Sequence, residues 1–280
     1  MNSDLKVFTV EVAENGPNHA VGVVDAIHTR LKKIDRRLQK NDFVTSGNGL
    51  SRPIPFDGIL TNKLLTALPG PDLARLLSYI EPVLLKAGCN VYNLGQEVEF
   101  VYFPETAIVS NVYSLADGDM TEAAVIGNEG IVGLSAILDS NPPTYWTKVT
   151  VSGTAVKVNR DIIKHEFVRS RAMQEVLLKY MNVFLSHLSQ RAVCNGSHHL
   201  EERLSTWLLM IHDRANGDPL PLTHEEIADH LGARRAGITG ACNNLRARGA
   251  IDYSRGHMQI LNRNVLEAAA CECYEALRTR

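Results

Sequence analysis

The amino-acid sequence predicts an α+β protein with an antiparallel β-domain, a long helix and a C-terminal winged helix-turn-helix. Three observations lead to this fold class. Between Glu81 and Val158, short segments rich in Val, Ile, Tyr and Thr alternate with turn residues, which is typical of an antiparallel sandwich, barrel or roll. Helical periodicity follows from about Asp161 to Gly196. The rest of the chain combines short helices with a hairpin pattern.

The composition is that of an ordinary globular protein. The chain has 280 residues, 45% hydrophobic and 21% charged, with a net charge of −2, and this length suffices for two domains. No apolar run approaches the roughly 18 residues of a membrane span, and the N-terminus lacks the basic start and apolar core of a secretory signal. Five scattered cysteines favour a reducing cytoplasm over a disulfide framework. We therefore expect a cytoplasmic protein that does not enter a membrane.

Residues 1–58 are expected to form an N-terminal extension. Apolar residues recur at helical spacing from about Asn18 to Lys40, and we interpret the basic end of this helix, RLKKIDRRLQK, as a solvated face. Residues 41–58, NDFVTSGNGLSRPIPFDG, hold the densest cluster of Gly, Pro, Ser and Asn, so they are interpreted as a linker.

Residues 59–160 are expected to form the β-domain, and residues 161–196 a long helix that follows it. An apolar stripe runs along this helix, which is longer than a small domain needs to cover its core. Part of the stripe is therefore available for a second copy of the chain, as in a coiled coil, although packing on the β-domain explains the periodicity equally well. The stripe consists of Phe167, Val176, Leu177, Tyr180, Met181, Phe184, Leu185 and Leu188.

Residues 197–280 are expected to form the last domain, whose centre is a pair of short helices between Leu222 and Ile251. Thr223 and Glu226 have the spacing of a capping box at the start of the first helix. Gly232 falls where the chain must turn sharply, and the second helix is expected from Arg234 to about Arg248. A helix that follows such a turn can enter the major groove of double-stranded DNA.

Basic residues gather in this segment. From Arg234 to Arg263 there are six arginines and one acidic residue, Asp252, a local balance of +5, and phosphate contact requires a basic face rather than a basic protein. The alternation around Ser254-Arg255-Gly256-His257 indicates a β-hairpin, the wing of a winged helix. Any one arginine is better explained as a solvated surface residue, but the ordered set favours DNA binding. The expected DNA-contacting residues are Thr223, Arg234, Arg235, Thr239, Asn243, Arg246, Arg255 and His257.

From about Leu60 to Tyr274 the chain resembles the Crp/Fnr family of bacterial transcription regulators. The resemblance rests on VYFPETAIVSNVYSLADGDMTEAAVIGNEGIVGL, EERLSTWLLMIHDR and LTHEEIADHLGARRAGITGACNNLRARGAI. It implies a β-roll like a cyclic-nucleotide-binding domain, a dimerisation helix and a C-terminal winged helix. It also implies a homodimer that binds palindromic promoter sites, with recognition helices about 34 Å apart, and that acts on RNA polymerase.

The chain departs from the cyclic-AMP-binding members of that family. Leu134 stands where those members have a glutamate, and no arginine occurs around Tyr145-Trp146-Thr147. A buried cyclic phosphate would lack its cation, so we expect no binding of cyclic AMP in the usual way, and the effector stays unknown. The corresponding effector pocket would be formed by Val132, Gly133, Leu134, Ser135, Tyr145 and Trp146.

The recognition helix departs as well. Of the arginine, glutamate and arginine that many members use to read bases, only the first has a match, in Arg235. Ala236 replaces the glutamate and Gly240 the second arginine. The preferred DNA sequence is therefore expected to differ from the family's usual half-site.

No cofactor or metal site is expected. No cysteine precedes Cys89, which disfavours the iron–sulfur centre of oxygen-sensing members. The stretch Cys194 to His199 has no second ligand pair at a suitable spacing. Cys271 and Cys273 lie two apart on the last expected helix, so their thiols are expected to point in different directions.

The sequence contains neither a P-loop nor a nucleophile elbow, so we do not expect an enzyme. The favoured function is a dimeric, sequence-specific transcription regulator. The alternative is a ligand-sensing or protein-interaction module whose helix-turn-helix no longer reads DNA.

Overall fold

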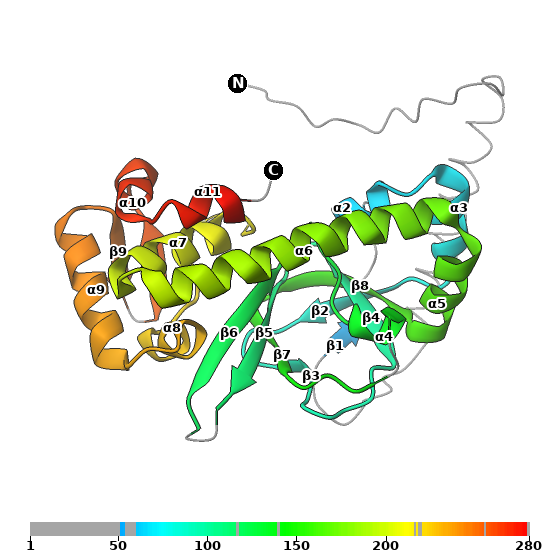
Figure 1. Ribbon diagram of the computed structural model, residues 1–280, viewed down its shortest axis with the longest axis horizontal. Coiled ribbons are helices and arrows are strands. Elements are labelled where there is room, and N and C mark those ends of the chain that lie inside the picture. Colours follow the sequence, from blue (N-terminus) through cyan, green and yellow to red (C-terminus); the bar gives the residue numbers. More distant parts are fainter. Residues whose placement is uncertain are drawn as a thin grey trace.

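The computed structural model describes residues 51–53, 60–115, 118–138, 141–215, 217, 220–254 and 256–278 (Figure 1). The helix expected over residues 18–40 lies outside the described residues. Within them, no helix is long and apolar enough to cross a membrane.

In the described part of the chain, eight strands form two four-stranded antiparallel sheets, which confirms the expected β-domain. The first sheet has the order β1-β2-β8-β4 and the second β3-β7-β5-β6. Residues 51–53 pair with β2 at the edge of the first sheet, so the interpretation of residues 41–58 as a linker is wrong for this part. The strands are β1 (Ser51–Pro53), β2 (Glu81–Leu85), β3 (Asn90–Tyr92), β4 (Phe100–Pro104), β5 (Ile108–Ser114), β6 (Met120–Ile126), β7 (Trp146–Val151) and β8 (Gly153–Asn159).

Side-chain alternation along the strands gives the first sheet two buried faces. Val83, Val109 and Val149 point into the space between the sheets, since successive residues of a strand face opposite sides. The other face of the first sheet packs against helices through Phe103 and Val156. The chain therefore has apolar cores on both sides of this sheet.

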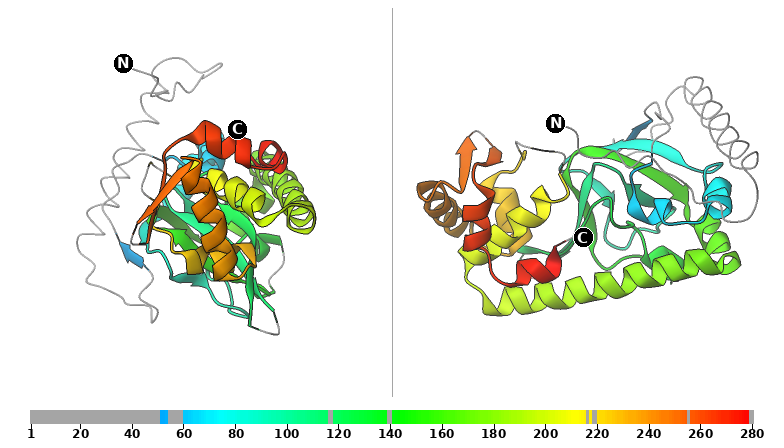
Figure 2. Two further views of the ribbon diagram at one scale, coloured as in Figure 1. Left: turned by 90° about the vertical axis from the view of Figure 1, so that its left-hand side faces the viewer. Right: turned by 90° about the horizontal axis from the view of Figure 1, so that it is seen from above.

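Helices α5 and α6 replace the single helix expected over residues 161–196. Ser170 adopts an extended conformation between them (φ −107°, ψ 112°), and its hydroxyl accepts the N–H of Met173 as the N-cap of α6. Helix α6 then crosses the whole molecule, from the β-domain to the C-terminal helices (Figures 1 and 2). The helices that accompany the β-domain are α2 (Lys63–Thr66), α3 (Gly70–Leu76), α4 (Ser135–Leu138), α5 (Arg160–Arg169) and α6 (Arg171–Ser197).

The apolar stripe of α6 divides between two faces. Leu177 and Tyr180 are buried against the β-domain and α2. Leu185 of the stripe points outward and is 59% exposed, and Leu178, which lies outside the expected stripe, also points outward and is 53% exposed. Packing on the β-domain thus accounts for only part of the stripe.

The C-terminal domain has the expected helix pair and hairpin. Its core contains the fully buried Trp207 and also takes in Ile108 and Val125 from β5 and β6, so it is shared with the β-domain. The elements are α7 (Leu200–His212), α8 (His224–Leu231), α9 (Arg235–Ala247), β9 (Ile251–Ser254), β10 (His257–Ile260), α10 (Arg263–Ala269) and α11 (Cys273–Leu277).

A buried carboxylate joins the two domains. Glu122 on β6 accepts the indole N–H of Trp207 on α7 (2.9 Å) and the hydroxyl proton of Ser110 on β5 (2.7 Å). Its oxygens also lie 3.3 Å from the Arg191 guanidinium of α6 and 2.8 Å from Nδ1 of His230 on α8. Buried charges are tolerated only when paired and hydrogen-bonded in this way.

We predict that Glu122→Gln lowers the free energy of unfolding by about 3–5 kcal/mol, because it leaves the buried Arg191 without its counter-charge. Urea unfolding followed by circular dichroism measures the change. The matched control is Glu175→Gln, which removes an exposed partner of Arg171 on α6 and should cost at most about 1 kcal/mol. Equal losses for both variants would contradict the assigned role.

The loss of stability caused by Glu122→Gln should depend on pH. Burial alone would raise the pKa of the Glu122 carboxyl, but His230 and Arg191 outweigh burial, and the pKa lies below its ordinary value of 4.5. A carboxyl with a lowered folded-state pKa stabilises the fold above its unfolded pKa and loses this contribution as pH falls through the folded value. The difference in unfolding free energy between wild type and Glu122→Gln should therefore be full at pH 7 and shrink below about pH 4.5.

Candidate nucleic-acid interface

The helix-turn-helix formed by α8 and α9 is named the reader. Its first helix, α8, begins and ends as the sequence predicts. The Thr223 hydroxyl accepts the N–H of Glu226 (3.2 Å), and the Glu226 carboxylate accepts the N–H of Thr223 (2.8 Å). Gly232 ends the helix in the left-handed conformation (φ 57°, ψ 47°). A Cβ added at Gly232 would lie 3.0 Å from the Thr121 hydroxyl, so the turn of the reader rests against the start of β6.

The second helix, α9, has one buried and one open side. Ile238, Ala241, Cys242 and Leu245 are buried beneath it. The residues left outside are Arg234, Arg235, Ala236, Gly237, Gly240, Asn243, Asn244, Arg246 and Ala247. A helix with this exposed N-terminal half meets the geometric need of a major-groove reader.

Arg235 stands at the start of α9. Its side chain is 70% exposed, and its Nε lies 3.6 Å from the Glu225 carboxylate. That pair is loose and solvated, so it is worth little. The guanidinium of Arg235 therefore stays available for a base or a phosphate.

The two glycines of α9 have different roles. A Cβ at Gly237 would meet the Leu200 side chain at 2.9 Å, whereas a Cβ at Gly240 would meet nothing within 4 Å. Gly237 thus lets α7 approach α9. Gly240 places a residue without a side chain on the exposed side of the helix.

Several of the arginines counted in the local balance of +5 are already paired. Arg246 binds Asp252 (2.9 Å) and Arg248 binds Glu201 (2.7 Å). Arg263 starts α10 and binds Asp213 (2.6 Å), so it belongs to the packing of the C-terminal segment. Among the described residues, Arg234 has no ion-pair partner.

The hairpin of β9 and β10 confirms the wing. Gly256 at its tip has φ 81° and lies near Thr223, since a Cβ there would be 3.5 Å from the Thr223 methyl group. His257 is exposed beside it. Arg255 lies outside the described residues, so its expected DNA contact remains an expectation.

His224 connects the parts of the reader, and sequence reasoning did not single it out. Its ring stacks on Tyr253 of the wing at 4.1 Å, and its Nδ1 lies 3.1 Å from the Thr239 hydroxyl of α9. Burial, followed by the charge of Arg235, lowers the pKa of His224, so it is neutral at pH 7. The hydroxyl of Thr239 also donates to the carbonyl of Arg235 (3.1 Å), which makes Thr239 part of this internal network.

Known proteins share both the reader and the fold. Residues 202–269 match the Crp-like helix-turn-helix domain family. The helix-turn-helix segment of this chain is therefore of the Crp-like type. A search among curated proteins gave no significant match.

Solved structures with a similar fold are distant in sequence. FixK2 from Bradyrhizobium japonicum is 18% identical with a TM-score of 0.59, over 69% of this chain and 98% of FixK2. A putative Crp/Fnr-family regulator from Eubacterium rectale is 18% identical with a TM-score of 0.60, over 75% and 98% of the two chains. A CRP-family regulator from Thermus thermophilus is 20% identical with a TM-score of 0.56, over 67% and 95%.

The segment expected to form the effector pocket is closely packed. Val132 pairs with Tyr102 through two backbone hydrogen bonds of 2.8 and 2.9 Å. A Cβ at Gly133 (φ 93°) would lie 2.6 Å from the hydroxyl of Tyr92. Leu134 and Ser135 follow at the start of α4, with the Ser135 side chain against Tyr145, while Trp146 lies across from Val112 in the second sheet.

The same segment is tied to the reader domain. The Glu129 carboxylate accepts from Nε of Arg214, just beyond α7, at 2.7 Å. Arg214 in turn donates to the carbonyl of Met210 (2.9 Å), and its side chain is almost fully buried. A movement of residues 127–135 would therefore shift or break the ion pair between Glu129 and Arg214 at the end of α7.

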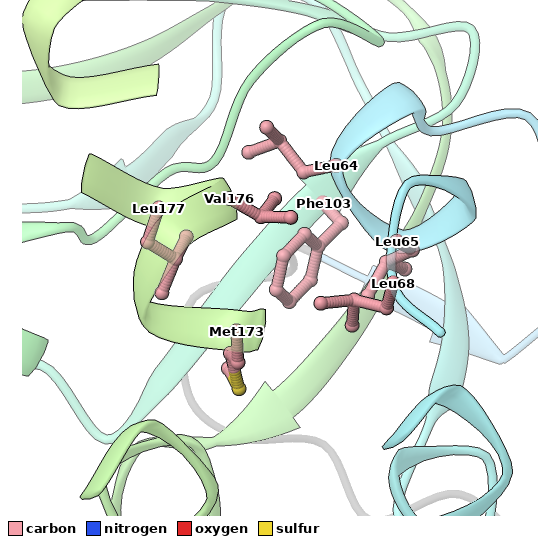
Figure 3. A pocket seen from close by; sticks show the side chains of 7 residues that line it. All are labelled: Leu64, Leu65, Leu68, Phe103, Met173, Val176 and Leu177. Carbon is pink, nitrogen blue, oxygen red and sulfur yellow. The ribbon is translucent and has the colours of Figure 1, made fainter. Parts of the chain in front are cut away.

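A small apolar pocket lies elsewhere, between α2, β4 and α6 (Figure 3). The ring of Phe103 lies at its centre, among side chains from both helices. Because its lining carries no charged or hydrogen-bonding side chain, it does not suit a nucleotide. The lining residues are Leu64, Leu65, Leu68, Phe103, Met173, Val176 and Leu177.

One expectation about the cysteines is wrong. The thiols of Cys271 and Cys273 do not diverge, and together with Cys194 and His198 their ligand atoms lie within 4.8 Å of one another. The chain turns at Glu272 before α11 begins, so the spacing is not that of a continuous helix. The second ligand pair was missed because it lies more than 70 residues along the chain from the first.

Proposed function

We propose that this protein is a transcription regulator of the Crp/Fnr type that binds palindromic promoter DNA as a homodimer, with α9 of each chain in a major groove. The observation that carries the proposal is the exposed N-terminal half of α9, where Arg234 and Arg235 stand free of strong ion pairs. Arginine takes guanine O6 and N7 together or grips a phosphate. No described group other than the solvated Glu225 competes for Arg235.

The other expected DNA contacts follow from the same placement. Asn243 lies two turns beyond Arg235 on the exposed side of α9, where it can reach a base edge or a phosphate. Thr223 lies at the start of α8 and His257 lies in the wing, and both are suited to contacts with the phosphate backbone of the DNA. Arg246 would need to leave Asp252, and Thr239 acts through His224 and Arg235.

The exposed face of α6 supports a dimer. Four apolar residues on this face follow one another at steps of three, four and three residues. They are Leu178, Met181, Leu185 and Leu188. This is the spacing of a coiled-coil seam, on the side of α6 that the β-domain does not cover. A twofold-symmetric seam would place two readers on successive turns of one face of the DNA, about 34 Å apart. Transcriptional control through RNA polymerase would then follow from where that site lies in a promoter.

The packing of residues 130–135 argues against cyclic AMP as effector. Leu134 offers no hydrogen-bond acceptor for a ribose, and Tyr145 and Trp146 offer no cation for a cyclic phosphate. Tyr92 fills the space beside Gly133. Any effector would have to displace these side chains or bind elsewhere.

We predict that Arg235→Ala weakens binding to the preferred operator by about 1–3 kcal/mol and relaxes its sequence preference, as expected for a bidentate base contact. Genome-wide mapping of bound sites supplies the operator, and fluorescence anisotropy over a salt series measures affinity. Arg171→Ala is the matched control, because this arginine is 91% exposed on α6 and its ion-pair partner among the described residues is the exposed Glu175.

Equal weakening on operator and unrelated DNA would make Arg235 a phosphate contact instead. A wild-type protein with no steep salt dependence and no preferred sequence would favour the alternative module that no longer reads DNA.

We predict that Leu185→Glu makes the chain monomeric at micromolar concentration, since it puts a charge into the seam. Light scattering coupled to gel filtration measures the mass. Val168→Glu on α5 is the control, because Val168 is 78% exposed and lies off the seam. A dimeric Leu185→Glu variant, or a monomeric wild type, would contradict the seam.

We predict that cyclic AMP at micromolar concentration gives no saturable heat with the wild-type dimer in isothermal titration calorimetry. The physical reason is the missing cation for the phosphate. The same preparation must bind operator DNA, which shows that it is folded. A saturable heat would overturn this prediction without affecting the proposed DNA site.

A further inference from the structure

Four side chains with metal-binding atoms meet where α6 and the C-terminal segment join. Cys194 lies in the last turn of α6, and His198 follows four residues later as its cap. Cys271 precedes α11, and Cys273 is its first residue. All four ligand atoms lie within 4.8 Å of one another. We propose that they form a mononuclear metal site of three thiolates and one imidazole, and that its ion is Zn²⁺.

The distances between ligand atoms suit one tetrahedral ion. Zn–S bonds of about 2.3 Å and Zn–N bonds of about 2.0–2.1 Å place tetrahedral S···S pairs about 3.8 Å apart and S···N pairs about 3.6 Å apart. Here Cys194 Sγ and Cys271 Sγ are 3.5 Å apart, and Cys273 Sγ and His198 Nδ1 are 3.5 Å apart. This spacing leaves room for a single ion and not for a multi-iron cluster.

Local structure explains why the four atoms converge. Residues four apart at the end of a helix share one face, which brings Cys194 and His198 together. The chain turns at Glu272, and the Tyr274 N–H donates to the Cys271 carbonyl (3.0 Å), so both thiols reach the same point. The resulting site is closed, with all three cysteines buried and His198 at its rim with 15% of its side chain exposed.

Neighbouring groups orient the ligands as outer-shell partners do in metal sites. Nε2 of His198 lies 3.2 Å from a Glu272 carboxylate oxygen, which keeps the proton on Nε2 and leaves Nδ1 free to coordinate. Gln190 Nε2 donates to Cys273 Sγ (3.0 Å). The Thr206 oxygen accepts the Cys271 N–H at 3.3 Å and lies 3.1 Å from its Sγ, so the hydroxyl proton can point to the sulfur.

Charge also favours the site. Three thiolates around a divalent ion carry a net charge of −1, which needs a nearby cation when buried. Arg203 on α7 interacts electrostatically with both Cys194 and Cys271. Its guanidinium supplies that cation without being a ligand.

The donor set selects the ion. Thiolates and an imidazole in a tetrahedral arrangement are typical of zinc, and a site with four protein ligands has no open position for a reaction. The ion would therefore be structural. It would fasten the C-terminal segment to the end of α6, next to the junction at which the reader domain begins.

The test uses full-length protein without a histidine tag, purified without chelators, and measures metal by inductively coupled plasma mass spectrometry. The expected result is about one zinc ion per chain. Cobalt titrated into chelator-treated wild type should give the strong d–d absorption of a tetrahedral thiolate site. This cobalt measurement keeps the proposal testable even if a variant fails to fold.

Variants then identify the ligands. Cys273→Ser and His198→Ala should lose the zinc, whereas His198→Cys should keep it because four thiolates also hold zinc. Cys89→Ser is the matched control, since this half-buried cysteine lies outside the cluster. Chelation should lower the thermal midpoint of wild type and Cys89→Ser but not that of Cys273→Ser.

Three results would overturn the proposal. One is wild-type protein with no more zinc than Cys273→Ser and no cobalt d–d bands. Another is a Cys194–Cys271 disulfide in metal-free protein under non-reducing mass spectrometry, which would assign the pair to thiol oxidation. Stoichiometric iron in place of zinc would overturn the choice of ion. None of these measurements depends on DNA binding, so failure here leaves the proposed function untouched.

Discussion

The buried carboxylate of Glu122 is the constraint on which the arrangement of this molecule depends. A single charged group on β6 is shared by Arg191 of α6, Trp207 of α7 and His230 of α8. None of these partners can move away without leaving a charge or a donor unpaired in the core, which is costly. The Glu129–Arg214 pair adds a second polar link at the other end of α7. The β-domain, the long helix α6 and the C-terminal domain are thus held in one relative position by polar contacts as well as by apolar packing.

Features set by neighbouring residues could be predicted from the sequence. The strands between Glu81 and Val158 appear where β-branched runs alternate with turn residues, and the capping box of Thr223 and Glu226 appears at the start of α8. Gly232 takes the left-handed turn that its position requires. The exposed face of α9 follows from the spacing of Ile238 and Leu245. Each of these depends on contacts within one helix, one strand or one turn.

Features that depend on residues far apart in the chain could not be predicted. The sequence around Glu122 does not distinguish it from an ordinary acidic residue in a strand, because three of its partners come from α6, α7 and α8. The cysteine cluster joins positions 77 residues apart, and only the fold makes them neighbours. The break at Ser170 was hidden because helical periodicity continues on both sides of one extended residue. Arg263 counted toward a basic face although tertiary packing directs it to Asp213.

The core shared by Trp207, Ile108 and Val125 limits how the two domains of this chain can be recombined with those of other proteins. A chimera that joins this β-domain to the C-terminal domain of another protein at the start of α7 would cut through a core and not through a linker. The incoming domain would have to bring an indole and an imidazole to Glu122, or the β-domain would have to exchange the acid for an apolar residue. Modular exchange in this chain is therefore limited by one carboxylate as much as by the sequence boundary between its domains.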